Sequence, residues 1–276
     1  MNKQYSAEEI KRLESTAQEI RRLIVQMLAK AGSGHPGGSL SSTDLLTVLF
    51  FSVLRHNPKN PQWPDRDRFH MSKGHCCPVW YAILAKSGYF PTEKLWTLRT
   101  LGSTLQGHPD RRTPGVEVAS GSLGQGLSVA LGMALAGKLD KKDYRVYCLM
   151  GDGEIQEGNI WEAAMATAHY KCDNICGILD YNHYQIDGKT DDVMNLEPIA
   201  DKWKAFGWNT IEIDGHNIKE ILGAYEAAKS AKGKPSIIIA RTIKGKGVSF
   251  MENVVDFHGR SPTKEEEIKA LKELEG

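Results

Sequence analysis

Two short groups of glycine and oxygen-bearing residues each follow an apolar run near the middle of the chain. Gly151–Gly153, with Asp152 at its centre, comes after Tyr144–Met150, and Asn182 comes shortly after Asn174–Leu179. A carboxylate and an amide oxygen suit Mg²⁺, which leaves other coordination positions for water and phosphate oxygens. Glycines beside the carboxylate let the backbone turn sharply and approach a diphosphate. The pattern therefore predicts a site for a metal ion and a diphosphate.

The elements around these groups predict how they are positioned. The two apolar runs are typical of buried strands, and Ile155–Tyr170 between them has the apolar spacing of a helix. In such a βαβ unit the strands lie parallel, with their carboxyl ends at the same edge of the sheet. We therefore expect Asp152 and Asn182 to lie side by side at that edge, where open α/β sheets bind ligands, beside a helix N-terminus that favours negative charge.

The rest of the chain predicts one doubly wound α/β domain over residues 1–276, with a mainly parallel sheet and helices on both faces. Helices are expected at about 7–31, which begins with a capping box at Ser6, and at 41–54, 75–86, 124–139, 196–206, 218–230 and 261–276. Further strands are expected at 67–72, 209–213 and 236–242. A long irregular stretch, 99–123, is rich in Gly, Pro, Ser and Thr, and such loops are usually functional.

Four histidines share a setting, because each lies in a predicted loop beside glycine. They are His35, His75, His108 and His258. Loops held by a rigid sheet often carry catalytic groups, and histidine moves protons near neutral pH and can donate to hydroxyls or phosphates. We interpret these four as candidate site residues. The remaining five, interpreted as structural, are His56, His70, His169, His183 and His216.

Composition excludes several classes of function. The 276 residues contain 35 Lys and Arg and 34 Asp and Glu, a formal charge of +1 that favours neither nucleic acid nor an anionic membrane. No apolar run is long enough to span a bilayer, and the polar N-terminus has no signal-peptide core. Five cysteines without a CxxC pair indicate buried thiols rather than disulfides or a zinc site, and a cytoplasmic location.

Taken in order, the motifs GHPGGS, SKGH, QGHPD, SGSLGQGL, GDGEIQEG, DYNHYQIDG and FHG resemble the N-terminal, diphosphate-binding part of transketolase. The match runs from about residue 10 to residue 262 and so covers nearly the whole chain. The resemblance implies the thiamine diphosphate-binding fold, thiamine diphosphate as cofactor, and Mg²⁺, or Ca²⁺ or Mn²⁺, as the metal ion.

The resemblance also implies roles around the cofactor. The metal ligands are the side chains of Asp152 and Asn182 and the backbone carbonyl of Tyr184. Groups at the diphosphate, beside the thiamine rings or elsewhere on the cofactor side are His75, Gly153, His258, Gly121, Ser122, Leu123, Ile186 and Ser39. Lys244 occupies a position that is basic in some transketolases and not in others, so its role stays open.

Catalytic roles follow from the same resemblance. His35, His108 and His258 match the residues that line the substrate funnel and handle the hydroxyls of donor and acceptor. Glu157 matches an acidic residue at a dimer interface that communicates between cofactor sites. The implied reaction transfers a two-carbon ketol unit from a ketose to an aldose, normally as sugar phosphates, as in the pentose phosphate pathway.

The resemblance covers only the first part of a transketolase. Nothing in the sequence matches the pyrimidine-binding domain, whose glutamate protonates the aminopyrimidine, or the third domain. We therefore expect an N-terminal subunit of a split transketolase that is active only with a C-terminal partner subunit, in an assembly of two copies of each. The exact sugars stay open, since enzymes acting on dihydroxyacetone or on sulfonate donors share much of this pattern.

Two alternatives stay open. The α subunit of a 2-oxoacid dehydrogenase shares the GDG-to-Asn signature, but it lacks GHPGG, SKGH and QGHPD together. A non-catalytic, cofactor-binding remnant is the other alternative, and retention of all four loop histidines, Glu157 and both metal-ligand side chains argues against it.

Overall fold

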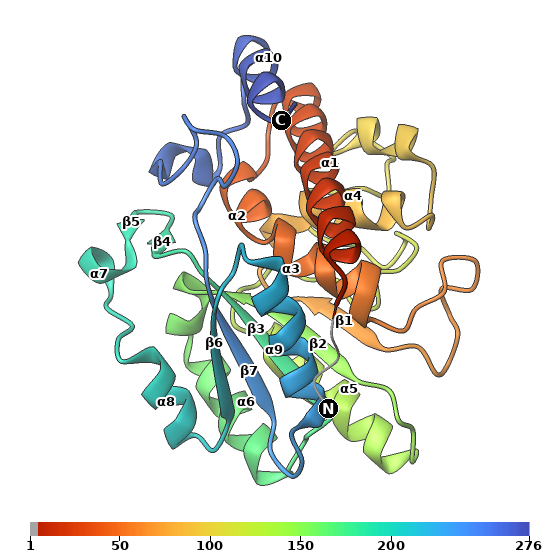
Figure 1. Cartoon of the computed structure of the whole chain (residues 1–276), viewed down its shortest axis with the longest axis vertical. Helices are drawn as coiled ribbons and strands as arrows, with labels where there is room; N and C mark the ends of the chain where they lie inside the picture. Colours follow the sequence, from red (N-terminus) through yellow and green to blue (C-terminus); the bar gives the residue numbers. More distant parts are fainter. Residues whose placement is uncertain (1–4, 276) are drawn as a thin grey trace.

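The computed structural model of the chain describes residues 5–275 and contains one five-stranded sheet with the order β1-β2-β3-β7-β6 (Figure 1). The strands are β1 (Arg68–Met71), β2 (Val146–Gly151), β3 (Ile175–Tyr181), β6 (Asn209–Asp214) and β7 (Ser236–Arg241). All neighbouring strands of this sheet pair in parallel, which confirms the predicted sheet type. Gly151 pairs with Asp180, so the carboxyl ends of β2 and β3 meet at one edge.

Helices cover both faces of the sheet, as predicted. One face carries α1 (Ala7–Ala31), α3 (Thr43–Val48), α4 (Cys77–Lys86) and α9 (Ile218–Ser230), and the other carries α5 (Gly126–Leu139), α6 (Gly158–His169) and α8 (Ile199–Ala205). Successive side chains of β2 point to opposite faces of the sheet, so this strand contributes to both cores. Tyr147 and Leu149 point into the first core, whereas Val146, Cys148 and Met150 point into the second.

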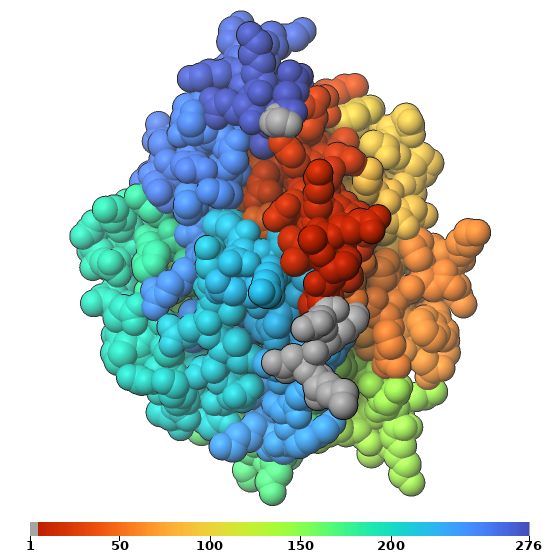
Figure 2. Space-filling model, viewed as in Figure 1, coloured from red at the N-terminus to blue at the C-terminus, as the bar shows by residue number. Residues whose placement is uncertain are grey.

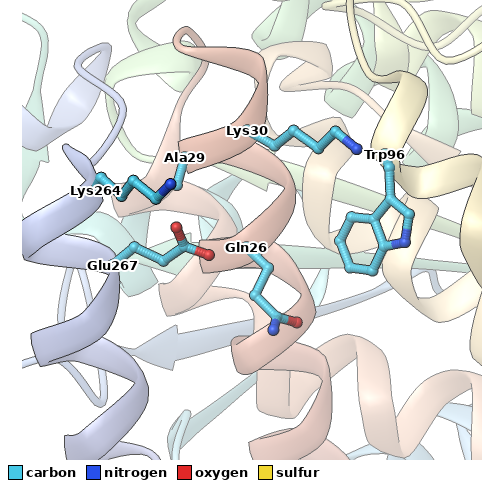
Figure 3. A pocket seen from close by; sticks show the side chains of 6 residues that line it. All are labelled: Gln26, Ala29, Lys30, Trp96, Lys264 and Glu267. Carbon is cyan, nitrogen blue, oxygen red and sulfur yellow. The ribbon is translucent and has the colours of Figure 1, made fainter.

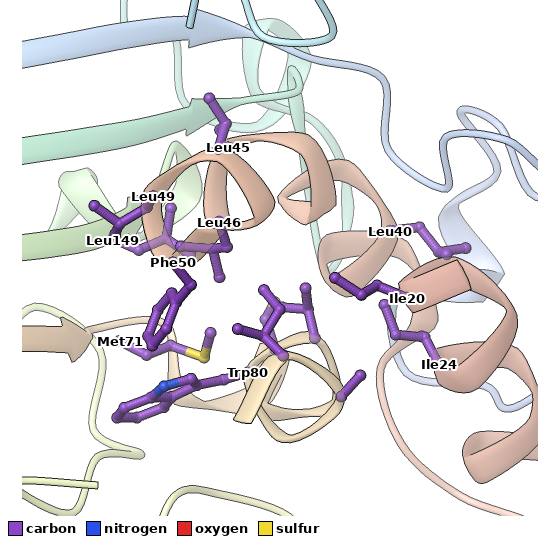
Figure 4. Close-up of a cluster of buried hydrophobic side chains, with 14 of the residues drawn as sticks. Ile20, Ile24, Leu40, Leu45, Leu46, Leu49, Phe50, Met71, Trp80 and Leu149 are labelled. Carbon is purple, nitrogen blue, oxygen red and sulfur yellow. The ribbon is translucent and has the colours of Figure 1, made fainter. Parts of the chain in front are cut away.

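The larger core lies between α1, α3, α4 and the sheet (Figure 4). Ile20 and Ile24 of α1 face Leu46 of α3, while Trp80 of α4 lies beside Met71 of β1, and all five side chains are fully buried. This packing fixes α1 and α4 over the sheet, and the loops at their ends then carry site residues.

The region that begins in the glycine-rich segment differs from the prediction. The expected loop already contains a helix, α2 (Pro36–Ser41), and the expected single helix at 41–54 is divided into α3 and a π-helical turn, η1 (Leu49–Val53). Pro36 stands at the first helical position, where its missing N–H costs no hydrogen bond, so a proline and two glycines do not prevent this short helix.

The N-terminal cap is simpler than predicted. Ser6 Oγ accepts a hydrogen bond from the amide of Glu9 at 3.1 Å, as expected for an N-cap. The Glu9 carboxylate, however, accepts from Ser52 Oγ at 3.1 Å. The predicted box at Ser6 is therefore a cap supported by a tertiary contact. A full capping box occurs instead at Thr263, where α10 (Lys264–Glu273) begins.

The short elements lay outside the predictions, because each is too brief to show a hydrophobic period. They are the hairpin of β4 (Tyr184–Gln185) and β5 (Gly188–Lys189), the helix α7 (Thr190–Val193), and four 3₁₀ turns, η2 (Gly74–Cys76), η3 (Thr92–Thr97), η4 (Gly153–Gln156) and η5 (Val255–His258). Residues 99–123 hold no helix or strand, as predicted.

Helix α10 packs beside α1 at one end of the structure, as the space-filling view shows (Figure 2).

All five cysteines are free and buried, which confirms the expectation of unpaired thiols. No helix within residues 5–275 has the length and apolar character needed to cross a membrane.

Candidate functional site

A cleft of about 400 Å³ lies at the carboxyl ends of β2 and β3 and holds nearly all of the predicted site residues. Those that line it are His35, His75, His108, Gly121, Leu123, Asp152, Gly153, Glu157, Asn182, Tyr184, Ile186, Lys244 and His258. They come from segments spread over more than two hundred residues of sequence, and the parallel sheet brings them to one edge.

Two predicted cofactor residues do not line this cleft. Ser39 is fully buried on α2, and its hydroxyl donates to the carbonyl of His35 at 2.7 Å, so it holds the backbone behind the cleft. Ser122 is exposed on the loop before α5, between the lining residues Gly121 and Leu123.

Asp152 is a buried acidic group where the cleft meets the carboxyl end of β2. One oxygen of its carboxylate, Oδ1, accepts from the amide of Gly153 at 2.8 Å, while Oδ2 is buried and has no hydrogen-bond partner among the described residues. Burial, followed by the nearby carboxylate of Asp180, raises the pKa of Asp152 to about 7. A buried carboxylate oxygen without a donor is a costly arrangement that a bound cation would relieve.

Asn182 supplies a second oxygen next to this carboxylate. Its Oδ1 accepts from the amide of Tyr184 at 3.1 Å and keeps a further lone pair, because an amide oxygen has two. This hydrogen bond also holds the start of the β4–β5 hairpin against the edge of the sheet. One carboxylate, one amide oxygen and one backbone carbonyl form a donor set that fits Mg²⁺ together with phosphate oxygens.

Gly153 lies where the β4–β5 hairpin packs closely on the end of β2. A Cβ atom at this position would lie 2.8 Å from Cβ of Gln185, so any side chain would collide with the hairpin. The residue also opens η4, and its amide donates to Oδ1 of Asp152. Gly153 therefore lets the hairpin lie against the strand edge, beside the unpartnered Oδ2 of Asp152, where a metal-bound diphosphate would fit.

Three of the four loop histidines form a compact cluster opposite this edge. The ring centroids of His35 and His75 are 5.1 Å apart, those of His75 and His258 are 5.3 Å apart, and those of His35 and His258 are 5.6 Å apart. His108 comes from the irregular stretch and lies against Gly121 on the same cleft. The four histidines that lie beside glycine in predicted loops therefore all line the same cleft.

The electrostatic setting keeps these imidazoles neutral. Burial lowers the pKa of His35 to about 4 and that of His258 to about 3, and it lowers the pKa of His75 well below the ordinary value. Burial also lowers the pKa of the more open His108. A neutral imidazole has one nitrogen that donates and one that accepts, which suits contact with sugar hydroxyls.

Lys244 lies in this cluster with a side chain that is almost fully buried. Its ammonium donates to Nδ1 of His258 at 2.9 Å and to the carbonyl of Gln185 at 3.4 Å. Burial lowers the pKa of Lys244 to about 8. Lys244 therefore contacts a predicted catalytic histidine, while its role in the reaction stays a prediction.

A buried ion pair beneath the cleft escaped the sequence analysis. Lys73 of the SKGH motif pairs with Asp180 of β3, and the same carboxylate accepts from Ser41 at 2.5 Å, from Ser42 at 2.8 Å and from Thr242. The pair ties α2, the end of β1 and the end of β7 to the floor of the site. The run LDYN contains the signal, since a carboxylate inside a buried strand needs a partner.

Glu154 is a second buried carboxylate that the sequence analysis left unassigned. It accepts from the hydroxyl of Ser72, from the amide of Gly124 at 3.1 Å and from the amide of Gly151 at 3.0 Å. These bonds join the loop before α5 to the ends of β1 and β2. Glu154 therefore fixes the backbone around Asp152, whereas the predicted Glu157 is exposed at the rim.

A separate hollow of about 520 Å³ lies between α1, η3 and α10 (Figure 3). It is lined by Gln26, Ala29, Lys30, Trp96, Lys264 and Glu267 and shares no residue with the cleft.

Among residues 5–275, no three His, Cys, Asp or Glu side chains converge to hold a metal ion. The metal assignment therefore depends on the mixed oxygen donors at Asp152 and Asn182.

Comparison with known proteins agrees with this geometry. A family model described as "Transketolase, thiamine diphosphate binding domain" matches residues 13–276. The chain is 49% identical over 264 residues to the "6-deoxy-6-sulfo-D-fructose transketolase subunit SqwG" of Clostridium sp. (strain MSTE9), covering 95% of this chain and 96% of the relative. It is 44% identical over 266 residues to one of the subunits of the apulose-4-phosphate transketolase of Phocaeicola vulgatus, covering 96% and 95%.

Solved structures give the same family but longer chains. The crystal structure of transketolase from Campylobacter jejuni matches with a TM-score of 0.92 and 39% identity, covering 96% of this chain and 43% of that one. Transketolase from Leishmania mexicana matches with a TM-score of 0.90 and 34% identity, covering 95% and 41%. The chain thus spans less than half of these enzymes and nearly all of the two subunits. The chain belongs to the transketolase family and has the fold of its thiamine diphosphate-binding domain.

Proposed function

We propose that this chain is the diphosphate-binding subunit of a split transketolase that transfers a two-carbon ketol unit from a ketose to an aldose. The observation that carries the proposal is the buried, unpartnered Oδ2 of Asp152, facing the same cleft as the four histidines. A cation site and a set of neutral proton-handling groups in one cleft suit a diphosphate cofactor and a polyhydroxylated substrate.

The strand ends would hold the cofactor. Asp152, Asn182 and the carbonyl of Tyr184 would bind Mg²⁺, or Ca²⁺ or Mn²⁺, and Gly153 leaves room for the diphosphate. His75, Gly121, Leu123 and Ile186 line the space beside it, and the exposed Ser122 is kept as a weaker candidate. When bound, thiamine diphosphate supplies the carbanion chemistry that breaks the C2–C3 bond of the ketose.

The histidines would act on the sugar. His35, His108 and His258 are neutral and lie within one cleft, so each can donate to one hydroxyl oxygen or accept from one hydroxyl proton. Lys244 donates to His258 and leaves the other nitrogen of that ring to carry a proton. The cluster therefore offers several donors and acceptors at fixed positions without adding charge.

A partner subunit would complete the site. The two subunits described above, which this chain matches over nearly their whole length, are named as transketolase subunits, whereas the longer transketolases continue beyond the matched part. We propose that a C-terminal subunit supplies the pyrimidine-binding domain, that two copies of each chain assemble with Glu157 near the contact between copies, and that the enzyme works in the cytoplasm.

The donor is proposed to be a ketose that carries an anionic group outside the two-carbon unit that is transferred. The two relatives are named for a 6-deoxy-6-sulfo sugar and for apulose 4-phosphate, so a sulfonate and a phosphate are both candidates. A panel of ketose phosphates and a ketose 6-sulfonate, each with an aldose phosphate acceptor, would separate these donors.

The test is ketol transfer after reconstitution. Purified chain, thiamine diphosphate, Mg²⁺, donor and acceptor are combined with and without the candidate partner subunit. We expect transfer only with the partner, because that subunit is proposed to supply the pyrimidine-binding domain and the group that activates the aminopyrimidine. Transfer by the chain alone would overturn the split-subunit proposal, and decarboxylation of a 2-oxoacid in place of ketol transfer would favour a dehydrogenase α subunit.

A further inference from the structure

Behind the histidine cluster lies a buried polar network that the proposed function does not use. Asp44 of α3 accepts two hydrogen bonds from the guanidinium of Arg21 on α1, at 2.9 and 2.6 Å. Its Oδ2 also faces Nδ1 of His216 at 2.7 Å, in the turn between β6 and α9. All three side chains lie outside the lining of the cleft.

The hydrogen bonds define the protonation of His216. The amide of Ile243 donates to Nε2 of His216 at 2.8 Å. Because a backbone N–H can only donate, Nε2 carries no proton, and the proton of the neutral ring is on Nδ1, which donates to Asp44. The ring therefore joins the carboxylate to the backbone of one particular segment.

That segment is the one that carries Lys244. His216 binds the amide of Ile243, directly before Lys244, while Nε of Arg21 donates to the carbonyl of Lys246 at 3.2 Å, shortly after it. The network thus holds the backbone on both sides of a lysine whose side chain enters the cleft. Gly245 adds a third anchor, since its amide donates to the carbonyl of Gly37 at 3.0 Å.

Lys244 in turn defines the state of His258. An ammonium group has no acceptor, so the 2.9 Å contact requires Nδ1 of His258 to accept and leaves the proton on Nε2. The position of Lys244 therefore decides which nitrogen of His258 donates.

We propose that Arg21, Asp44 and His216 form a positioning network that holds the segment around Lys244, so that Lys244 fixes the Nε2–H tautomer and the orientation of His258. The catalytic use of His258 rests on the proposed function, but the tautomer does not. His216, which the sequence analysis interpreted as structural, is then a positioning residue for the active site.

Two conservative variants separate the network from general stability. The amide of Gln in His216→Gln reaches the position of Nε2 and can accept from the amide of Ile243. The shorter amide in His216→Asn lies at the position of Nδ1, so it can donate to Asp44 but cannot reach Ile243. His56→Leu is the matched control, because His56 is also half-buried and bonded through both ring nitrogens, to Tyr89 and to the carbonyl of Phe50, away from the cleft.

The first measurement is ¹⁵N NMR of the histidine-labelled full chain, with His258 assigned from the spectrum of His258→Gln. We expect wild type, His216→Gln and His56→Leu to show His258 with the proton on Nε2. His216→Asn should shift His258 towards a mixture of tautomers. Lys244→Met should give the same mixture, because it removes the group that donates to Nδ1 of His258. A single Nε2–H tautomer in Lys244→Met, or the same spectrum in His216→Gln and His216→Asn, would overturn the proposal.

The second measurement is ketol transfer by the enzyme reconstituted with its partner. His216→Asn should lower kcat/KM by about 10- to 100-fold, the scale of a small displacement of a catalytic group, while His216→Gln stays near wild type and cofactor affinity is unchanged. If the wild-type enzyme shows no ketol transfer, the proposed function fails, yet the NMR result still decides on the network. Equal kcat/KM in wild type and His216→Asn would show that the network has no role in positioning.

Discussion

The two walls of the cleft are built in different ways. The strand-edge wall, formed by Asp152, Gly153, Asn182 and Tyr184, comes from a single βαβ unit, and its oxygens stand where two parallel strands end. The histidine wall, formed by His35, His75, Lys244 and His258, draws on loops from three separate parts of the chain. One wall offers an unsatisfied anionic oxygen, and the other offers neutral rings beside a buried ammonium.

This difference assigns the two walls to different partners. A bound cation would stabilise a buried acceptor that has no donor, so the strand-edge wall suits the metal and the diphosphate. Neutral imidazoles with both a donor and an acceptor suit hydroxyl groups, so His35 and His258 of the histidine wall suit the sugar, whereas His75 lies beside the proposed cofactor. Each wall is also held from behind by a buried carboxylate, Glu154 for the first and Asp44 for the second. Substitution of the strand-edge carboxylate and substitution of a sugar-side histidine should therefore differ in their effects on cofactor binding and on turnover.

The largest effect on turnover is expected at His108, which extends the histidine wall. His108→Ala should lower kcat/KM by roughly 10²- to 10⁴-fold, the usual contribution of a positioned acid or base. Cofactor affinity should stay near wild type, because no strand-edge group changes. Steady-state kinetics and calorimetry on the reconstituted enzyme check both values. Weak cofactor binding with normal turnover per loaded site would show that His108 acts on the cofactor and not on the sugar.

An intermediate effect is expected behind the strand-edge wall. The amide of Gly124 bonds Oε1 of Glu154 and the amide of Gly151 bonds Oε2. Glu154→Gln replaces one of these oxygens with a donor, so one of the two amides loses its acceptor and the free energy of unfolding should fall by about 1–3 kcal/mol. Glu162→Gln on the exposed surface of α6 is the matched control and should change little. Urea unfolding of the chain measures both. Equal stability of the two variants would remove Glu154 as the anchor of this wall.

The smallest effect is a pH dependence behind the histidine wall. Burial alone would raise the pKa of Asp44, but Arg21 and His216, the two charged or titratable groups that contact it, hold that pKa below the ordinary 3.8. A lowered pKa stabilises the fold above pH 3.8, and this stabilisation is lost as the pH falls below that value. The stability difference between wild type and Asp44→Asn should therefore narrow below about pH 4 in urea unfolding. A difference that stays constant from pH 7 to pH 3 would contradict this.

The fold was largely accessible from sequence, because its long elements carry strong periodic patterns. Helix α9 has the predicted bounds, Ile218–Ser230, and β2 and β3 lie where apolar runs predicted them. Helix α2 was missed, because a proline and two glycines conceal a short helix that tertiary packing stabilises. The hairpin at Tyr184–Lys189 was also missed, since two-residue strands have no readable period.

The strand-edge wall was also predictable, since strand ends follow from local sequence. The histidine wall was predictable only in part. The glycine-flanked loop setting marked His35, His75 and His258 as candidates, but their meeting depends on how the loops fold over the sheet, and their individual roles came from the family resemblance. The pair of Lys73 with Asp180 needed the packing of α2 and the ends of β1 and β7 against β3. Ser39 shows the same limit, since its motif was correct but its side chain points into the backbone behind the cleft.

The most direct test of the assignment of the two walls is a calorimetric titration of thiamine diphosphate into the reconstituted enzyme. It is made with Mg²⁺ and after chelation, for wild type, Asp152→Ala and His108→Ala. We predict tight binding that requires Mg²⁺ in wild type and in His108→Ala. Asp152→Ala should lose more than about 100-fold in affinity, beyond the loss typical of residues that only support a metal ligand. Metal-independent binding in wild type, or unchanged affinity in Asp152→Ala, would contradict the assignment of the strand-edge wall.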